Sequence, residues 1–144
     1  EDAEVLLAAC GGRPMDALAM ARGGVDAARW SALPGAIAMG RVDALAGWSL
    51  PGAVDALQKL CHDAMRLTTG GHPVFYPADA VRPAAGLEPL TVLAGELAQA
   101  ARADEHPLSE PLQLEALAMR AHAAWKAPRG QAAQRSGRAD TLPR

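Results

Sequence analysis

Aromatic residues are scarce in this sequence: they make up 3% of the 144 residues, with a single Phe and a single Tyr. β-Sandwiches and barrels depend on aromatic and β-branched side chains to fill the space between strands. Alanine, by contrast, accounts for about a quarter of the chain, and it has the highest helix propensity of all residues. The composition therefore predicts an all-α protein.

Long apolar runs and a dominant charge of one sign are also missing. No segment approaches the roughly 20 apolar residues that span a bilayer, and the chain begins at Glu1 without an initiator Met or a signal peptide. The 14 basic and 16 acidic residues are interspersed and give a net charge of −2. We therefore expect a cytoplasmic piece of a larger protein, with no membrane partner and no direct nucleic-acid site.

Residues that supply metal or thiol chemistry are few and widely spaced. Cys10 and Cys61 form no C-x-x-C motif. None of the four histidines has another potential metal ligand at the residue spacing typical of metal sites. We expect both cysteines to be reduced and buried. His62 and His122 are expected to be exposed or hydrogen-bonded helical side chains, so the sequence predicts no metal and no cofactor.

Catalytic motifs are not found either. The Gly-rich turn at residues 9–13 lacks the Lys and Ser/Thr of a phosphate-binding loop and follows an expected helix instead of a strand. No G-x-S-x-G or H-E-x-x-H pattern occurs. The acidic residues fall almost entirely at expected helix starts or on polar helix faces, where capping and solubility explain them. We predict that this segment has no catalytic site and is not itself an enzyme.

Two short helices, over residues 3–10 and 15–21, are predicted around a Gly-Gly-Arg-Pro turn. Glycine supplies the left-handed conformation that ends the first helix, and proline suits the first turn of the second. Another Gly-Gly pair follows and marks a flexible joint. We therefore predict a domain boundary between residues 1–24 and residues 25–126.

Apolar residues recur at helical spacing through the second of these domains. The expected helices begin at Asp26, Ser49 and Pro89 and after Ser109, and a single short turn is expected from Asp43 to Trp48. The helix after Ser49 is the longest and runs to about Thr69, whereas Pro34-Gly35 is expected to kink or split the one after Asp26. The pattern predicts a bundle of five to six helices, preceded by the two short ones.

Residues 72–87 contain three prolines and the chain's only Phe and Tyr, so they are expected to form an extended crossover. Phe75 and Tyr76 are predicted to pin this crossover to the bundle. Residues 127–144 are rich in Pro, Gly, Gln, Arg, Ser and Ala and contain one Leu. We expect them to form a disordered tail whose four arginines are solvated.

The tryptophans differ in their expected environments. Trp30 and Trp125 fall on apolar stripes and are expected in the core, whereas Trp48 lies at a short turn and is expected to be partly exposed. Large apolar side chains at a surface are the usual anchors of protein contacts. The candidate subunit-interface residues are Trp48, Phe75, Tyr76, Leu112 and Met119.

Five segments occur in an order that resembles one known family. They are LLAACGGRPMDALAM at 6–20, DALAGW at 43–48, DAMRLT at 63–68, FYP at 75–77 and EPLQLEAL at 110–117. This order resembles the delta prime subunit of the bacterial DNA polymerase III clamp loader. The first segment is similar to the end of the AAA+ lid domain, and the others are similar to the C-terminal collar domain.

One departure from the AAA+ pattern bears on nucleotide binding. ATP-binding members of the wider family carry a sensor Arg after the glycine of the lid turn. Here Met15 occupies that register, and Arg13 lies two residues earlier. The departure fits delta prime, which the family describes as a stator without ATPase activity, and it implies that this segment makes no nucleotide contact.

The resemblance implies a non-catalytic oligomerisation module. In the family, delta prime completes a five-membered ring with the tau/gamma and delta subunits, and that ring loads the sliding clamp onto primed DNA during replication. The parent protein would be a subunit of the DNA-directed DNA polymerase III holoenzyme, a nucleotidyltransferase complex. Two alternatives stay open: the collar of the tau/gamma ATPase subunit, and a free-standing helical regulatory or interaction domain.

Overall fold

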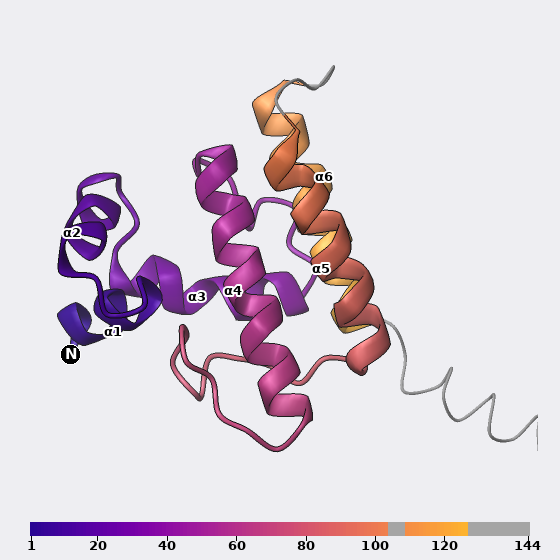
Figure 1. Ribbon diagram of the computed structural model, residues 1–144. Helices are drawn as coiled ribbons and strands as arrows, with labels where there is room; N and C mark the ends of the chain where they lie inside the picture. Colours follow the sequence, from indigo (N-terminus) through magenta and orange to yellow (C-terminus); the bar gives the residue numbers. More distant parts are fainter. Residues whose placement is uncertain (104–108, 127–144) are drawn as a thin grey trace, which may run out of the picture.

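The computed structural model describes residues 1–103 and 109–126, and within these residues the chain forms six helices and no strand (Figure 1). The helices are α1 (Asp2–Ala9), α2 (Pro14–Arg22), α3 (Ala27–Ala38), α4 (Leu50–Thr68), α5 (Leu87–Arg102) and α6 (Glu110–Lys126). The prediction of an all-α helical bundle is confirmed. The expected disordered tail at 127–144 lies outside the described residues.

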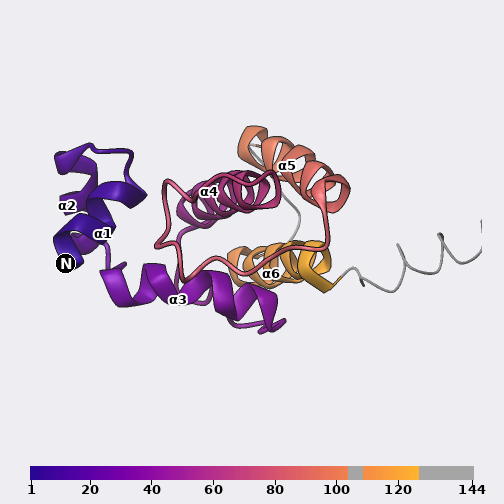
Figure 2. The ribbon, with the colours of Figure 1, turned by 90° about the horizontal axis from the view of Figure 1, so that it is seen from below.

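Helices α4, α5 and α6 run side by side, and each is antiparallel to the next along the chain (Figure 1). Helix α3 runs across this group and packs against α6 (Figure 2). Helices α1 and α2 form a hairpin beside the start of α3, and α1 contacts α3 directly. Because Ala9 of α1 is fully buried in the same core cluster, the hairpin is joined to the bundle by apolar packing. The division at residue 24 stays a prediction.

The described part of 25–126 holds four helices, fewer than the five to six expected. One reason is that α3 continues through Pro34 and is not split there. An internal proline costs a helix about 3 kcal/mol. Trp30, Leu33 and Ile37 on the same helix are each at most 2% exposed, and burying such side chains contributes about 1.5–3 kcal/mol each. Tertiary packing therefore outweighs the local cost of the proline.

The other reason is that residues 42–47 form successive turns and no helix. Asp43 was expected to cap a helical turn, but its carboxylate pairs with Arg41 at 3.4 Å. The guanidinium of Arg29 donates a hydrogen bond to the carbonyl of Ala46 at 2.6 Å. The turns are thus fixed by a contact from α3, which local sequence does not specify.

Helix α4 is the central element and follows the sequence closely. The hydroxyl of Ser49 accepts the backbone N–H of Gly52 at 3.1 Å, which satisfies one of the free donors of the first turn. The helix ends at Thr68, and Gly70 beyond it has a φ of +87°, a conformation that favours glycine. The boundaries predicted from Ser49 and from the following Gly-Gly pair are confirmed.

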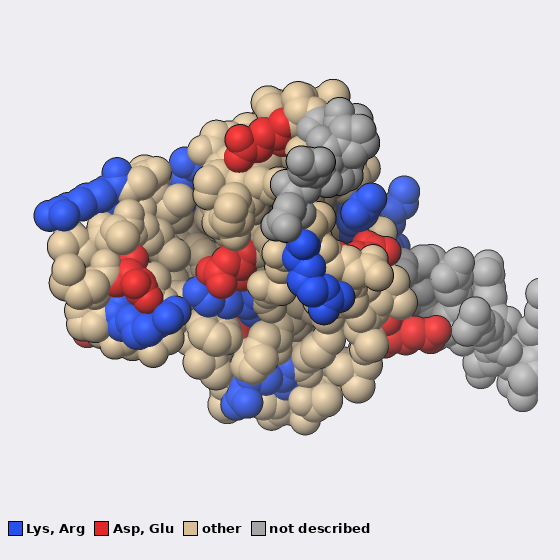
Figure 3. Space-filling model, turned by 45° about the horizontal axis from the view of Figure 1, so that its top comes forward, with Lys and Arg blue, Asp and Glu red and all other residues tan. Residues whose placement is uncertain are grey.

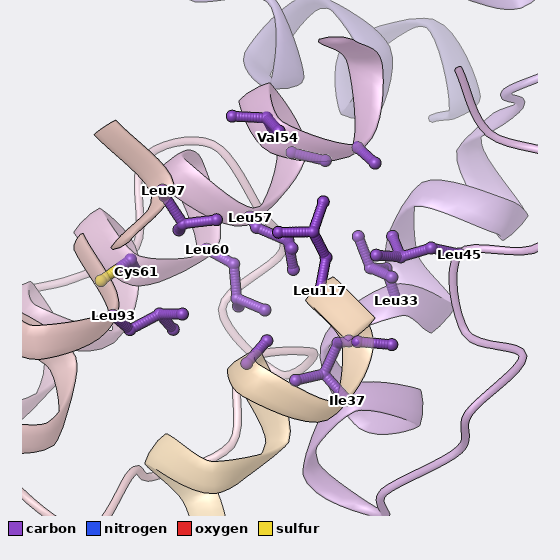
Figure 4. Close-up of a cluster of buried hydrophobic side chains, with 14 of the residues drawn as sticks. Leu33, Ile37, Leu45, Val54, Leu57, Leu60, Cys61, Leu93, Leu97 and Leu117 are labelled. Carbon is purple, nitrogen blue, oxygen red and sulfur yellow. The ribbon is translucent and has the colours of Figure 1, made fainter. Parts of the chain in front are cut away.

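The core lies where α3, α4, α5 and α6 meet. Figure 4 shows their side chains converging on one cluster. Its labelled members are Leu33, Ile37, Leu45, Val54, Leu57, Leu60, Cys61, Leu93, Leu97 and Leu117. Trp30 is fully buried as predicted, whereas Trp125 is only partly buried and donates from its indole to the carbonyl of Arg82 at 3.0 Å. None of the helices in the described residues is long and apolar enough to cross a membrane.

The crossover between α4 and α5 is held by one buried carboxylate. Asp63 of α4 is fully buried and accepts the backbone N–H groups of Val74, Phe75 and Tyr76 at 2.8–2.9 Å. The Tyr76 ring stacks on Trp30 with 4.3 Å between centroids, and the Trp30 indole donates to the carbonyl of Phe75 at 3.1 Å. The prediction that Phe75 and Tyr76 pin the crossover is confirmed.

Candidate protein-interaction surface

The thiols of this chain are placed as core groups. Cys10 and Cys61 are free, and they are 3% and 2% exposed. The thiol of Cys61 donates to the carbonyl of Leu90 at 3.1 Å, and burial raises its pKa to about 11. Burial also raises the pKa of Cys10. Both thiols are therefore protonated near neutral pH, and neither is a ready nucleophile or metal ligand.

The histidines also have structural surroundings. His122 lies on α6, and its Nδ1 donates to the carbonyl of Ile37 on α3 at 2.9 Å. His62 is exposed on α4, with its ring edge against Phe75 at 5.3 Å between centroids. No group of three His, Cys, Asp or Glu residues in 1–103 and 109–126 is placed to hold a metal ion. Both histidines occupy the kinds of position predicted for them.

Asp63 has a buried structural role that its sequence context does not predict. Acidic residues are expected almost entirely at helix starts and on polar faces, yet Asp63 is fully buried. A signal was present, because Asp63 lies three residues after Leu60 and four before Leu67 and so shares their apolar helix face. Its three backbone donors occupy both oxygens, so Asp63 acts as a structural anchor for the crossover.

Large apolar side chains remain exposed over several parts of the molecule. Those at least 37% exposed are Leu7, Met15, Leu18, Met39, Val42, Val74, Leu87, Val92, Leu112 and Met119. Helix α2 buries none of its residues. Clusters of exposed apolar side chains on a small protein are typical of surfaces that contact other chains. The described residues therefore offer apolar surface at several separate places.

The outer face of α6 carries two of the predicted interface residues. Leu112 is 51% exposed and Met119 is 46% exposed. They are seven residues apart, which places them two turns apart on one helix face. Ala116, partly buried, and Ala123, exposed, continue the same face. We call these four residues the α6 outer stripe.

Trp48 and Tyr76 are both buried, which does not suit their assignment to an interface. Trp48 is 6% exposed, so the expectation that it is partly exposed is wrong: its ring packs 6.3 Å from Trp30, and the Arg29 guanidinium covers it at 5.3 Å. Tyr76 is 3% exposed, and its hydroxyl donates to the carbonyl of Ala56 at 2.7 Å. Neither side chain projects outward as an apolar anchor.

The five candidate residues do not form one surface. Phe75 is partly buried under the Lys59 ammonium group, which lies 5.6 Å from its ring centroid. Phe75 and Tyr76 line a pocket beside α1, whereas Trp48 lines a different pocket beside the start of α6. Leu112 and Met119 face outward from α6. The five predicted interface residues therefore lie at three separate places on the structure.

Charged side chains do not add a single-sign surface. On the face shown in Figure 3, acidic and basic groups alternate over the helices with uncharged surface between them. The ion pairs among the described residues include Arg13 with Asp16 at 3.0 Å and Lys59 with Asp55 at 2.8 Å. Such a distribution favours contact with proteins over contact with a phosphate backbone.

Comparisons with known proteins give no match: no family model fits the chain, and neither the curated proteins nor the solved structures searched include a similar one. The resemblance to delta prime thus rests on the five sequence segments. The fold and the exposed apolar surface rest on the structure.

Proposed function

We propose that this chain is a non-catalytic oligomerisation module whose helices pack against other protein chains. The observation that carries the proposal is the α6 outer stripe, where Leu112 and Met119 are about half exposed on one helix face. Solvent-facing apolar residues at helical spacing reduce solubility unless a partner covers them. The buried thiols and the hydrogen-bonded His122 and Asp63 are consistent with a structural role.

The partners we propose are the tau/gamma and delta subunits of a bacterial clamp loader, with this chain in the place of delta prime. The order of the five sequence segments supports this assignment, and an all-helical bundle with a preceding two-helix hairpin is the architecture it implies. The ring so assembled would load the sliding clamp onto primed DNA in the cytoplasm. The chain itself would supply subunit contacts and no nucleotide site.

A pull-down tests this proposal. The 144-residue chain, shown to be folded by circular dichroism, is immobilised and exposed to purified tau/gamma and delta subunits of the same organism. We expect retention of at least one subunit in a stoichiometric amount. Failure of both subunits to bind the folded chain would contradict the clamp-loader assignment.

A second measurement separates delta prime from the tau/gamma alternative. We expect no ATP binding in calorimetry, because the lid turn has Met15 where the sensor Arg would lie. Saturable binding at micromolar ATP would contradict the alignment of Met15 with the sensor Arg and would favour the collar of an ATPase subunit. A phosphate-binding Lys encoded upstream of Glu1 would also favour the tau/gamma alternative.

A further inference from the structure

A pocket of about 280 Å³ lies between the turns at residues 42–48 and the start of α6. Of the residues that line it, we call the buried Trp48 and Leu114 its floor, whereas Val42 and Pro111 are exposed at the surface. Trp48 and Leu114 are each 6% exposed, so little of either side chain reaches solvent, whereas Val42 is 48% exposed at the edge. We call this the Trp48 pocket. Most of its lining surface is apolar.

The rim of the Trp48 pocket is acidic. Asp43, Glu110 and Glu115 all line it, and no Lys or Arg is among its lining residues. Asp43 is partly neutralised by Arg41, and one oxygen of Glu110 accepts the backbone N–H of Leu50 at 2.8 Å. Within the described part of the chain, no ion pair is formed by Glu110 or Glu115. The Arg29 guanidinium also lies beside the pocket, at the carbonyl of Ala46. The three carboxylates still outnumber Arg29 and Arg41, so the surroundings of the pocket have a net negative charge.

The pocket is held open by contacts outside its cavity. Arg29 fixes the turns through its bond to the Ala46 carbonyl, and the Trp48 ring contacts both Arg29 and Trp30. The bond from Leu50 to Glu110 ties the start of α4 to the start of α6. A preformed pocket loses little conformational entropy when it is filled, which favours binding.

We propose that the Trp48 pocket receives an apolar side chain from a partner protein, in a segment that carries Lys or Arg next to that side chain. This inference rests on the proposed function and names the chemistry of one contact. The volume is slightly below the roughly 300–1,000 Å³ of small-molecule sites, which suits one or two side chains. The acidic rim selects a basic segment, and the apolar floor selects Leu, Met or Phe as the anchor.

The test begins with selection of a random 12-residue displayed peptide library against the folded 144-residue chain. Two variants challenge the pocket: Glu115→Lys reverses a rim charge, and Ala46→Phe fills the cavity from an exposed position. Two exposed positions on α5 outside the pocket provide matched controls, Glu96→Lys and Ala101→Phe. All four substitutions are at exposed residues, so the fold is expected to persist, and circular dichroism checks this.

We expect the selected peptides to be enriched in an apolar residue beside Lys or Arg. Their affinity should fall at least about fivefold in each pocket variant, remain unchanged in both controls, and weaken as salt is raised. Selected peptides without basic residues would overturn the inference. So would equal binding to Glu115→Lys and Ala46→Phe, or the recovery of no binding peptide.

The same variants separate this inference from the proposed function. If tau/gamma or delta binds the wild-type chain and both pocket variants equally, the proposed function stands and the Trp48 pocket has no part in it. If the selected peptides behave as expected but neither subunit binds, the pocket inference stands and the clamp-loader assignment fails.

Discussion

The carboxylate of Asp63 accepts the backbone N–H of Tyr76 at 2.8 Å, although 13 residues separate them along the chain. The same carboxylate accepts two further N–H groups, from Val74 and Phe75. One side chain therefore fixes the crossover against α4. The crossover in turn brings the Tyr76 ring onto Trp30, so the anchor also organises the aromatic part of the core.

Replacing Asp63 with Asn tests this anchor. One carboxylate oxygen accepts from Val74 and the other from Phe75 and Tyr76, so an amide in either orientation turns its NH2 group toward at least one backbone donor. We expect the free energy of unfolding, measured in urea at pH 7, to fall by about 2–3 kcal/mol. Asp55→Asn on the same helix weakens a pair with Lys59 whose carboxylate is 53% exposed, so it should cost less than the Asp63 substitution. Equal costs for the two variants would contradict the anchor.

Gly40→Ala tests the contact between α3 and α6. Gly40 has a φ of +77°, and a Cβ there would lie 2.8 Å from Nε2 of His122. Because that imidazole is bonded to the carbonyl of Ile37, we expect a loss of about 2–3 kcal/mol in urea unfolding. Gly70→Ala is the matched control: it has a φ of +87° and open space around it, so it should lose only the backbone cost of about 1–2 kcal/mol.

The burial of Cys61 should be detectable as a loss of stability at alkaline pH. Burial raises the pKa of its thiol to about 11, so the folded chain keeps this proton at a pH where the unfolded chain has lost it. The free energy of unfolding should therefore fall as pH rises from about 9 to 11, by up to about 2 kcal/mol from this group. Serine does not titrate in this range. The free energy of unfolding of Cys61→Ser, measured in urea between pH 8 and 10.5, should therefore fall less steeply than that of the wild-type chain. Parallel curves for the two proteins would contradict the assignment.

Local signals in the sequence were sufficient for α4. Ser49 as the cap, the apolar spacing that follows it and the Gly-Gly pair after Thr69 all act within a few residues, and the helix has these limits. The sequence predicts a kink or a split at Pro34, and α3 is not split there. The packing of Trp30, Leu33 and Ile37 compensates for the proline and depends on distant segments. An estimate made from the helix sequence alone includes the cost of the internal proline and omits the tertiary packing that offsets it.

The candidate surface was predicted less well for the same reason. Leu112 and Met119 were assigned to the surface from the period of α6, and their exposure confirms that position. Trp48 is expected to be partly exposed because it lies at a short turn beside Ser49. The groups that cover it, Arg29 and Trp30, lie at least 18 residues away in the chain.

The α6 outer stripe should matter for binding and not for folding. We expect the double substitution Leu112→Glu and Met119→Glu to change the free energy of unfolding by less than about 1 kcal/mol, because both side chains are about half exposed. Affinity for the bound clamp-loader subunit should fall at least about tenfold in calorimetry. Val92→Glu, at a 58% exposed position on α5, is the control and should leave the affinity unchanged. Unchanged affinity of the double variant would remove the stripe from the interface.

The most direct measurement is size-exclusion chromatography with light scattering of the 144-residue chain, alone and mixed with tau/gamma and delta. The account predicts a monomer of 14.9 kDa alone and a stable complex of defined stoichiometry on mixing. A chain that remains a monomer in the presence of both subunits, or that forms a tight homodimer by itself, would contradict it.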